Sequence, residues 1–373
     1  MSYQTSAIIS EREELFSSMI IEAIEKGVGI WQRGWYKSQI PLPHNPSTGT
    51  MYKGINAAML ALKSMLLGYP TLEFMTFNQI KDLNGFVKKG EKAVKVSFFY
   101  HFEKKDDEKL SQMSEETRQK YFDEYNKLSN TQKQRLDEEK ELFIIRVYPV
   151  FNVAQCENID TIKLAELKDK NKIPTPQEFE KLKFVENPFI EAILKNSGIE
   201  IRHGGDRAFY IPRDDFIQLP PRENFKSISE YYSTALHELG HATGHPTRLN
   251  RFKENDKNYD KLSYAKEELR AETYSLIQAF DLGLEFDLGN HASYLEHYAQ
   301  ILQHSKDEIK LAVKDAMKIN EFVKSKWYPK DKNLTQQRGL DKEKQTQTKN
   351  TQSKSQESLN KGNIANKTYS MSR

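Results

Sequence analysis

Hydrophobic positions along the chain follow helical spacing in some segments and strand spacing in others, a pattern that predicts an α+β protein. Residues 10–26 and 57–67 are predicted to form helices, and residues 95–100 and 143–152 are predicted to form strands because aromatic and β-branched side chains dominate them. The first helix has an apolar stripe made of Leu15, Met19, Ile20, Ala23 and Ile24.

Residues 104–141 interrupt this pattern with a densely charged, helix-prone segment. Its apolar stripe consists of Tyr121, Phe122, Tyr125 and Leu128. We expect one or two helices that form a solvated appendage. Because strand spacing resumes directly afterwards, the insertion is predicted to link two neighbouring strands.

The second half of the chain begins after a polar, proline-punctuated stretch, residues 157–182, which predicts a linker. Residues 188–197 predict a helix, and residues 208–212 and 215–220 predict a short hairpin. Prolines in the hairpin suit an edge strand that could pair with an extended peptide substrate.

A metal-ligand motif, His237-Glu238-Leu239-Gly240-His241, lies in a predicted helix. The i, i+4 spacing places both imidazoles on one helix face, where they can bind one Zn²⁺. Glu238 could then act as general base toward water. The alternative is a chance match on an ordinary amphipathic helix.

The sequence around this motif favours the metal site. Residues 227–230 resemble a capping box, and Tyr231, Ala235 and Leu236 are expected to pack on a core. Gly244 is expected to end the helix in a left-handed conformation. Two histidines and a glutamate facing a core would be costly without a metal or other partners.

A third protein ligand is needed, and two candidates exist. His245 follows the motif closely but lies beyond the expected helix end, next to a proline. Glu268 is the better candidate, and Glu272, one turn later, could accept a hydrogen bond from a ligating histidine. The alternative for this second helix is a surface helix whose glutamates pair with Lys266 and Arg270.

A last helix is predicted over residues 292–305. Its candidates for stabilising an oxyanion are Tyr294, His297, Tyr298 and His304. Core or rim positions are the alternative for Tyr294 and Tyr298, and we assign no role to this group.

Composition narrows the class of protein. The chain has 373 residues, 37% of them hydrophobic and 29% charged, without an apolar run long enough for a membrane helix. The N-terminus shows no signal-peptide pattern, and Cys156 is the one cysteine, which fits the cytoplasm. Zinc ligands must therefore be histidines and carboxylates.

The net charge of +3 is unevenly distributed. Residues 31–100 carry +6 and residues 331–373 carry +5, which leaves −8 for the rest of the chain. Two basic segments predict a polyanionic partner. The candidate DNA-binding residues are Trp31, Arg33, Trp35, Lys37, Lys53, Lys88, Lys89 and Lys92.

Aromatic and basic side chains alternate within residues 27–37, as in proteins that stack bases beside bound phosphates. The alternative is a loop whose tryptophans fill the domain core, which fits Trp31 better. Residues 85–92 suggest a tight turn that presents ammonium groups, with a solvated lysine turn as the alternative.

Several of these segments together resemble the ArdC-type antirestriction proteins. Residues 27–35, 43–56, 75–79, 87–92 and 148–152 are similar to the N-terminal domain of that family, which plasmid conjugation proteins of the TraC primase type share. The resemblance implies sequence-independent binding of single-stranded DNA.

The C-terminal segments resemble the zincin-like metallopeptidase domain of the same family. They are residues 237–245, 248–251, 264–272, 290–294 and the closing helix to about Lys326. This resemblance implies a gluzincin-type site in which Glu268 is a ligand.

We therefore expect an N-terminal single-stranded-DNA-binding domain (1–156), a linker (157–182), a zincin-like domain (183–330) and a disordered tail (331–373). The resemblance implies a protein that protects transferred DNA of a mobile element from restriction in a recipient cell. We expect one Zn²⁺ and a protein substrate. The alternatives are a non-catalytic DNA-binding protein with a structural metal site, or an accessory protein in conjugative priming.

Overall fold

The computed structural model describes residues 3–26, 42–175, 177, 178, 181, 184–252, 261–284 and 305–330. Helices and strands are mixed in it, which confirms the predicted α+β class. The chain divides into two compact units, the first built mainly from residues before Pro174 and the second mainly from later ones. The predictions that lie outside the described residues concern Trp31, Arg33, Trp35, Lys37, the helix 292–305 with Tyr294, His297, Tyr298 and His304, and the tail 331–373.

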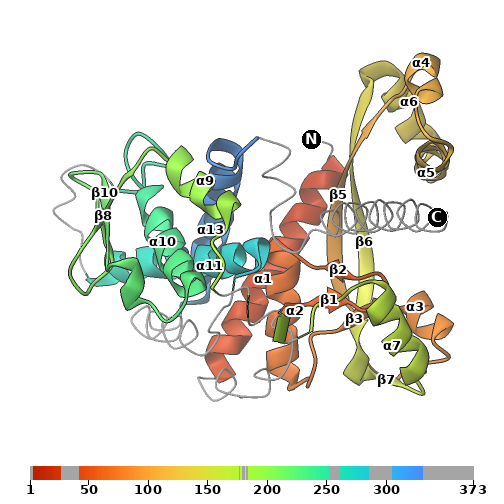
Figure 1. Ribbon diagram of the computed structural model, residues 1–373, viewed down its shortest axis with the longest axis horizontal. Coiled ribbons are helices and arrows are strands. Elements are labelled where there is room, and N and C mark those ends of the chain that lie inside the picture. The colour runs from red at the N-terminus through yellow and green to blue at the C-terminus, as the bar shows by residue number, and fades with distance from the viewer. Residues whose placement is uncertain are drawn as a thin grey trace, which may run out of the picture. The chain divides into compact units, whose positions relative to one another are not determined.

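The first unit is organised around an antiparallel three-stranded sheet of order β3-β6-β5, formed by β3 (Phe74–Thr76), β5 (Val94–Glu103) and β6 (Glu141–Asn152). Helix α1 (Tyr3–Lys26) contacts β6. Figure 1 shows the β5–β6 ribbon extending to the helical insertion. The remaining elements of the first half of the chain are β1 (His44–Asn45), β2 (Thr50–Met51), α2 (Gly54–Leu67), α3 (Phe77–Asp82), β4 (Phe86–Val87) and β7 (Cys156–Glu157).

The insertion links the two longest strands, as predicted, because β5 and β6 pair from Val94↔Val150 to Glu103↔Glu141. It contains three helices, α4 (Asp107–Ser111), α5 (Glu115–Asn126) and α6 (Asn130–Glu139), where one or two were expected. Each helix begins after a side-chain cap, and these short polar caps divide the charged stretch. The caps are Asp106, Ser114 and Ser129.

The expected linker contains a helix, α7 (Thr161–Lys170). Its buried Leu164 packs in a small core with Met75, Ile80 and Leu83. Asp160 caps the helix by accepting a hydrogen bond from the Lys163 amide at 2.9 Å. Part of the predicted linker, helix α7, therefore packs in a small core of the first unit.

The second unit combines helices with a small mixed sheet of order β8-β10-β9. Strands β9 (Phe209–Ile211) and β10 (Phe216–Leu219) form the predicted antiparallel hairpin. A third strand, β8 (Glu200–His203), pairs in parallel with β10 and was not predicted. The helices are α9 (Pro188–Asn196), α10 (Ile228–Ala242), α11 (Lys261–Leu282) and α13 (Lys306–Lys326).

A single apolar cluster joins these elements through α10, whose Tyr231, Ala235 and Leu236 are buried in it. Helix α11 contacts both α10 and α13. No helix among the described residues is long and apolar enough to cross a membrane.

Candidate metal centre

Helix α10 begins where the sequence predicts. The Ser227 side chain caps it by accepting a hydrogen bond from the Glu230 amide at 3.1 Å. The Glu230 carboxylate accepts from the Lys226 amide at 2.7 Å rather than from the cap residue itself. Both contacts satisfy amides at the helix N-terminus, which fixes the start of the helix that carries the motif.

The end of α10 differs from the prediction for Gly244. Gly244 does not have a positive φ, so the prediction that it ends the helix in a left-handed conformation is wrong. A Cβ placed on it would lie 2.5 Å from Cε2 of Phe252. Gly244 is therefore required by close packing against an aromatic ring rather than by backbone conformation.

Gly240, inside the motif, allows α10 and α11 to approach closely. A Cβ on Gly240 would lie 2.6 Å from Cδ1 of the buried Tyr274 on α11. This contact sets the separation of the two helices at the level of the histidines. It thereby positions α10 against the carboxylates of α11.

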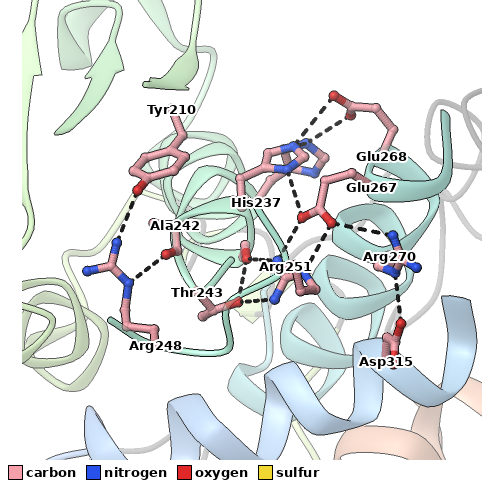
Figure 2. A network of polar contacts seen from close by, with 12 residues as sticks. Tyr210, His237, Ala242, Thr243, Arg248, Arg251, Glu267, Glu268, Arg270 and Asp315 are labelled. Carbon is pink, nitrogen blue, oxygen red and sulfur yellow. Dashed lines mark hydrogen bonds and ion pairs between the residues drawn. The ribbon is translucent and has the colours of Figure 1, made fainter. Parts of the chain in front are cut away.

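His237, His241 and Glu268 come together between these helices. Figure 2 shows His237 and Glu268 facing each other. The two Nε2 atoms lie 3.1 Å apart. Glu268 Oε2 is 3.6 Å from Nε2 of His237, and its Oε1 is 3.6 Å from Nε2 of His241. Among the described residues this is the group of histidine and acidic side chains that could hold a metal ion.

These separations fit a divalent ion. Tetrahedral bonds of about 2.0–2.1 Å place neighbouring ligand atoms about 3.3 Å apart. Two imidazoles and one carboxylate are also a donor set that Zn²⁺ accepts when it keeps a fourth position for water. The residues present therefore fit the metal that the sequence predicts.

The remaining ring nitrogens face carboxylates. Glu272 Oε1 lies 3.7 Å from Nδ1 of His237, at the position predicted for it. Glu267 Oε1 lies 3.5 Å from Nδ1 of His241, a contact that was not predicted. Burial lowers the pKa of His241, but hydrogen bonds to Glu267 and Glu268 outweigh burial and raise it above its ordinary value.

Glu238 is buried beside these groups. Burial raises the pKa of its carboxyl group, and the neighbouring histidines lower it by less. A carboxylate with a raised pKa accepts a proton more readily near neutral pH, which suits a general base.

The contacts of the structure do not match the two alternatives considered from the sequence, His245 as the third ligand and α11 as a surface helix. His245 contacts Thr247, with Nδ1 2.8 Å from Oγ1, and is not part of the cluster. Glu268 and Glu272 are buried, so α11 is not a plain surface helix. Its Lys266 instead pairs with Glu308 of α13 at 2.7 Å.

The predicted lysines of the DNA face have different environments. Lys88 Nζ donates to the carbonyl of Ala154 at 3.0 Å, whereas Lys89 and Lys92 are exposed. Gly90 has a φ of 89°, which forms the predicted turn between them. Lys53, half-buried, directly precedes α2.

The sequence did not indicate the ion pair between Arg251 and the buried Glu267, whose side chains lie 2.7 Å apart. Arg251 lies in a segment that resembles the family, but its position ten residues after His241 follows no ligand spacing. Its contact with the Glu267 carboxylate of α11 depends on the tertiary fold.

Two family profiles match the chain. Residues 10–151 match the N-terminal domain of anti-restriction factor ArdC, and residues 188–315 match the zincin-like metallopeptidase family. The site and the second profile together define the class of this half of the chain as a zincin-like metallopeptidase domain.

Individual relatives cover most of the chain. The antirestriction protein ArdC of plasmid R388, in a metal-free crystal structure, is 30% identical and matches over 83% of this chain and 96% of its own, with a TM-score of 0.46. A Mn(II)-bound structure of ArdC from the same plasmid is 28% identical, matches over 86% of this chain and 99% of its own, and has a TM-score of 0.48. The sequence identity of 30% over 96% of the first ArdC protein, together with the ArdC N-terminal profile over residues 10–151, shows that the chain belongs to the ArdC family of antirestriction proteins.

Two curated relatives extend the comparison. The DNA primase TraC of Escherichia coli is 36% identical over 322 residues, which are 83% of this chain but 20% of that protein. The uncharacterized protein y4eC of Sinorhizobium fredii is 28% identical over 323 residues, which are 86% of this chain and 92% of that protein. The chain thus spans about a fifth of the length of this TraC relative.

Proposed function

We propose that this antirestriction protein binds single-stranded DNA without sequence preference and hydrolyses peptide bonds with one Zn²⁺ held by His237, His241 and Glu268. The observation that carries the catalytic half is the convergence of three ligand atoms within 4.8 Å of one another, beside a buried glutamate. The zincin-like profile and the Mn(II)-bound ArdC structure support a divalent ion at such a site.

In this proposal Glu238 acts as the general base and then as the general acid. Its carboxylate takes a proton from the attacking water and passes it to the nitrogen that leaves when the peptide bond breaks. A divalent ion supplies Lewis acidity toward the water and the peptide carbonyl. Glu272 and Glu267 would hold the two imidazoles so that their Nε2 atoms face the ion.

The DNA-binding half of the proposal is supported by the relatives of the chain and by the chemistry of its N-terminal region. The similar proteins include an antirestriction protein and a DNA primase. Lys89 and Lys92 present two exposed ammonium groups on one turn, and such groups bind phosphates through release of counterions.

The substitution Glu238→Gln tests the catalytic half. It removes the base but keeps the size and polarity of the side chain, so cleavage of labelled casein should fall by about 10²- to 10⁴-fold. Binding of zinc and of a labelled oligothymidylate should remain. Glu230→Gln, an exposed change on the same helix, is the matched control and should cleave like the wild type.

Two results would contradict the catalytic assignment. The first is cleavage by the Glu238→Gln protein at the wild-type rate. The second is a zinc-loaded wild type that binds the oligonucleotide but cleaves nothing, which would favour a non-catalytic DNA-binding protein with a structural metal.

A further inference from the structure

Arg251 ties the end of the motif helix to helix α11. Its guanidinium donates to the Gly240 carbonyl at 2.9 Å and to the Thr243 hydroxyl at 2.8 Å. The same group forms two contacts with the Glu267 carboxylate, Nη2 to Oε1 at 2.7 Å and Nε to Oε2 at 3.1 Å. Figure 2 shows Arg251 between Thr243 and Glu267. This two-pronged geometry restricts the orientation of the carboxylate.

The same Glu267 carboxylate also contacts His241, one of the proposed metal ligands. Its Oε1 atom is shared between Arg251 and Nδ1 of His241. A carboxylate that accepts from Nδ1–H fixes the tautomer of the imidazole, and Nε2 is then left with its lone pair toward the metal. Only 11% of the Arg251 side chain and 5% of the Glu267 side chain are exposed, so solvent weakens this interaction little.

Arg270, on the same helix α11, links this carboxylate to helix α13. Arg270 Nη1 lies 3.7 Å from Glu267 Oε2, and Arg270 Nε donates to Asp315 of α13 at 2.9 Å (Figure 2). Glu267 is thus contacted by two guanidinium groups from different segments. Their positive charge offsets part of the negative charge of the acidic side chains around the ligands.

We propose that Arg251 and Glu267 are positioning residues that orient His241 and tune the affinity of the metal centre. The inference rests on the proposed metal site and adds to it a residue that lies outside the motif. Neither side chain is assigned contact with the ion or the substrate. Their effect passes through the imidazole of His241.

Arg248 provides a matched control because it is bound in a similar way without touching the ligands. Its Nε donates to the Ala242 carbonyl at 2.6 Å, and its Nη1 donates to Asp215 at 3.0 Å. It also donates to the Tyr210 hydroxyl at 3.0 Å. Removing it would disturb the same helix end while leaving the contact of Glu267 with His241.

The test measures zinc affinity by competition with a chromogenic chelator, using the full chain with Arg251→Met, Glu267→Gln or Arg248→Met. Loss of such a hydrogen-bond partner weakens metal binding by about 10- to 100-fold. We expect this loss for the first two variants and an affinity within about 3-fold of wild type for Arg248→Met. Because Arg251 and Glu267 act as a unit, their double variant should lose less than the product of the two single effects.

The absorption spectrum of the cobalt-substituted protein separates positioning from folding. Glu267→Gln should shift the ligand-field bands, whereas Arg248→Met should leave them unchanged. Arg251→Lys keeps the charge without the planar fork, so it remains informative if Arg251→Met does not fold, and it should also weaken zinc binding.

Three outcomes would overturn the inference: Arg251→Lys and Glu267→Gln bind zinc like the wild type, their cobalt spectra are unchanged, or Arg248→Met loses as much affinity as Arg251→Met. A failure of the proposed metal site itself looks different. In that case either the wild type would bind no zinc, or the His237→Ala protein would bind zinc as tightly as the wild type.

Discussion

Replacing Gly240 by alanine should damage the metal centre more than it damages the fold. The added Cβ would lie 2.6 Å from Cδ1 and 3.0 Å from Cε1 of Tyr274. Ordinary contacts of this kind are 3.4–4 Å long, so one side must move by about 1 Å. The ring is fully buried, and the movement must therefore be taken up mainly by separating α10 from α11.

The two consequences differ in size. Overpacking of a core costs about 1–3 kcal/mol, and the better helix propensity of alanine returns about 1 kcal/mol. The net loss of unfolding free energy should therefore be about 0–2 kcal/mol. Metal sites tolerate deviations of only about 0.2 Å in their bonds, so a shift of His241 relative to Glu268 should weaken zinc binding by about 10-fold or more.

The assay combines chelator competition for zinc with urea unfolding of the metal-free protein. Tyr274→Leu in the Gly240→Ala background should recover part of the affinity, because the smaller side chain restores the helix approach. Tyr274→Leu alone controls for loss of the ring. If Gly240→Ala binds zinc with wild-type affinity, the close approach of the helices is not what sets the ligand geometry.

Two further predictions concern the lysine turn of the first unit and Asp215 of the second unit. Lys89→Ala with Lys92→Ala should reduce the salt dependence of oligothymidylate binding by about 0.7 per lost phosphate contact. Lys88→Ala should change this slope less, because its ammonium group holds the Ala154 carbonyl; equal slopes for all variants in filter-binding titrations would exclude this turn from the DNA face. For Asp215, burial raises the pKa, but hydrogen bonds from Arg248 and Tyr210 outweigh burial and lower it. The ionised Asp215 carboxylate therefore stabilises the folded protein above the pKa of the unfolded state, which is about 3.9. This stabilisation is lost as the pH falls through the lower pKa of the folded state. Urea unfolding should show Asp215→Asn about 1 kcal/mol less stable than wild type at pH 7, with a difference that shrinks below about pH 4; a constant difference would contradict the role of its charge.

Residue spacing was sufficient to predict features that depend on a single helix or strand. The i, i+4 histidines, the Ser227 cap and the buried face of α10 follow from local sequence, and the structure has them in one helix. The pairing of β5 with β6 was also predictable, because strand spacing stops and resumes on either side of the charged insertion.

The features that the sequence did not predict depend on tertiary packing. The sequence predicts a backbone role for Gly244, whereas in the structure this glycine leaves room for the ring of Phe252. The contact of Glu267 with His241 depends on the rotation of α11 against α10, which spacing within one helix does not determine. Helix α7 was not predicted because few of its side chains are apolar: Leu164 is buried in the small core and Leu167 packs partly against it.

The most direct test of the central claim is the zinc content and affinity of the purified wild type, Glu268→Ala and His245→Ala proteins. We predict one zinc ion per chain for the wild type and for His245→Ala, and loss of tight binding for Glu268→Ala. Tight binding that survives Glu268→Ala, or disappears in His245→Ala, would contradict a centre built from His237, His241 and Glu268.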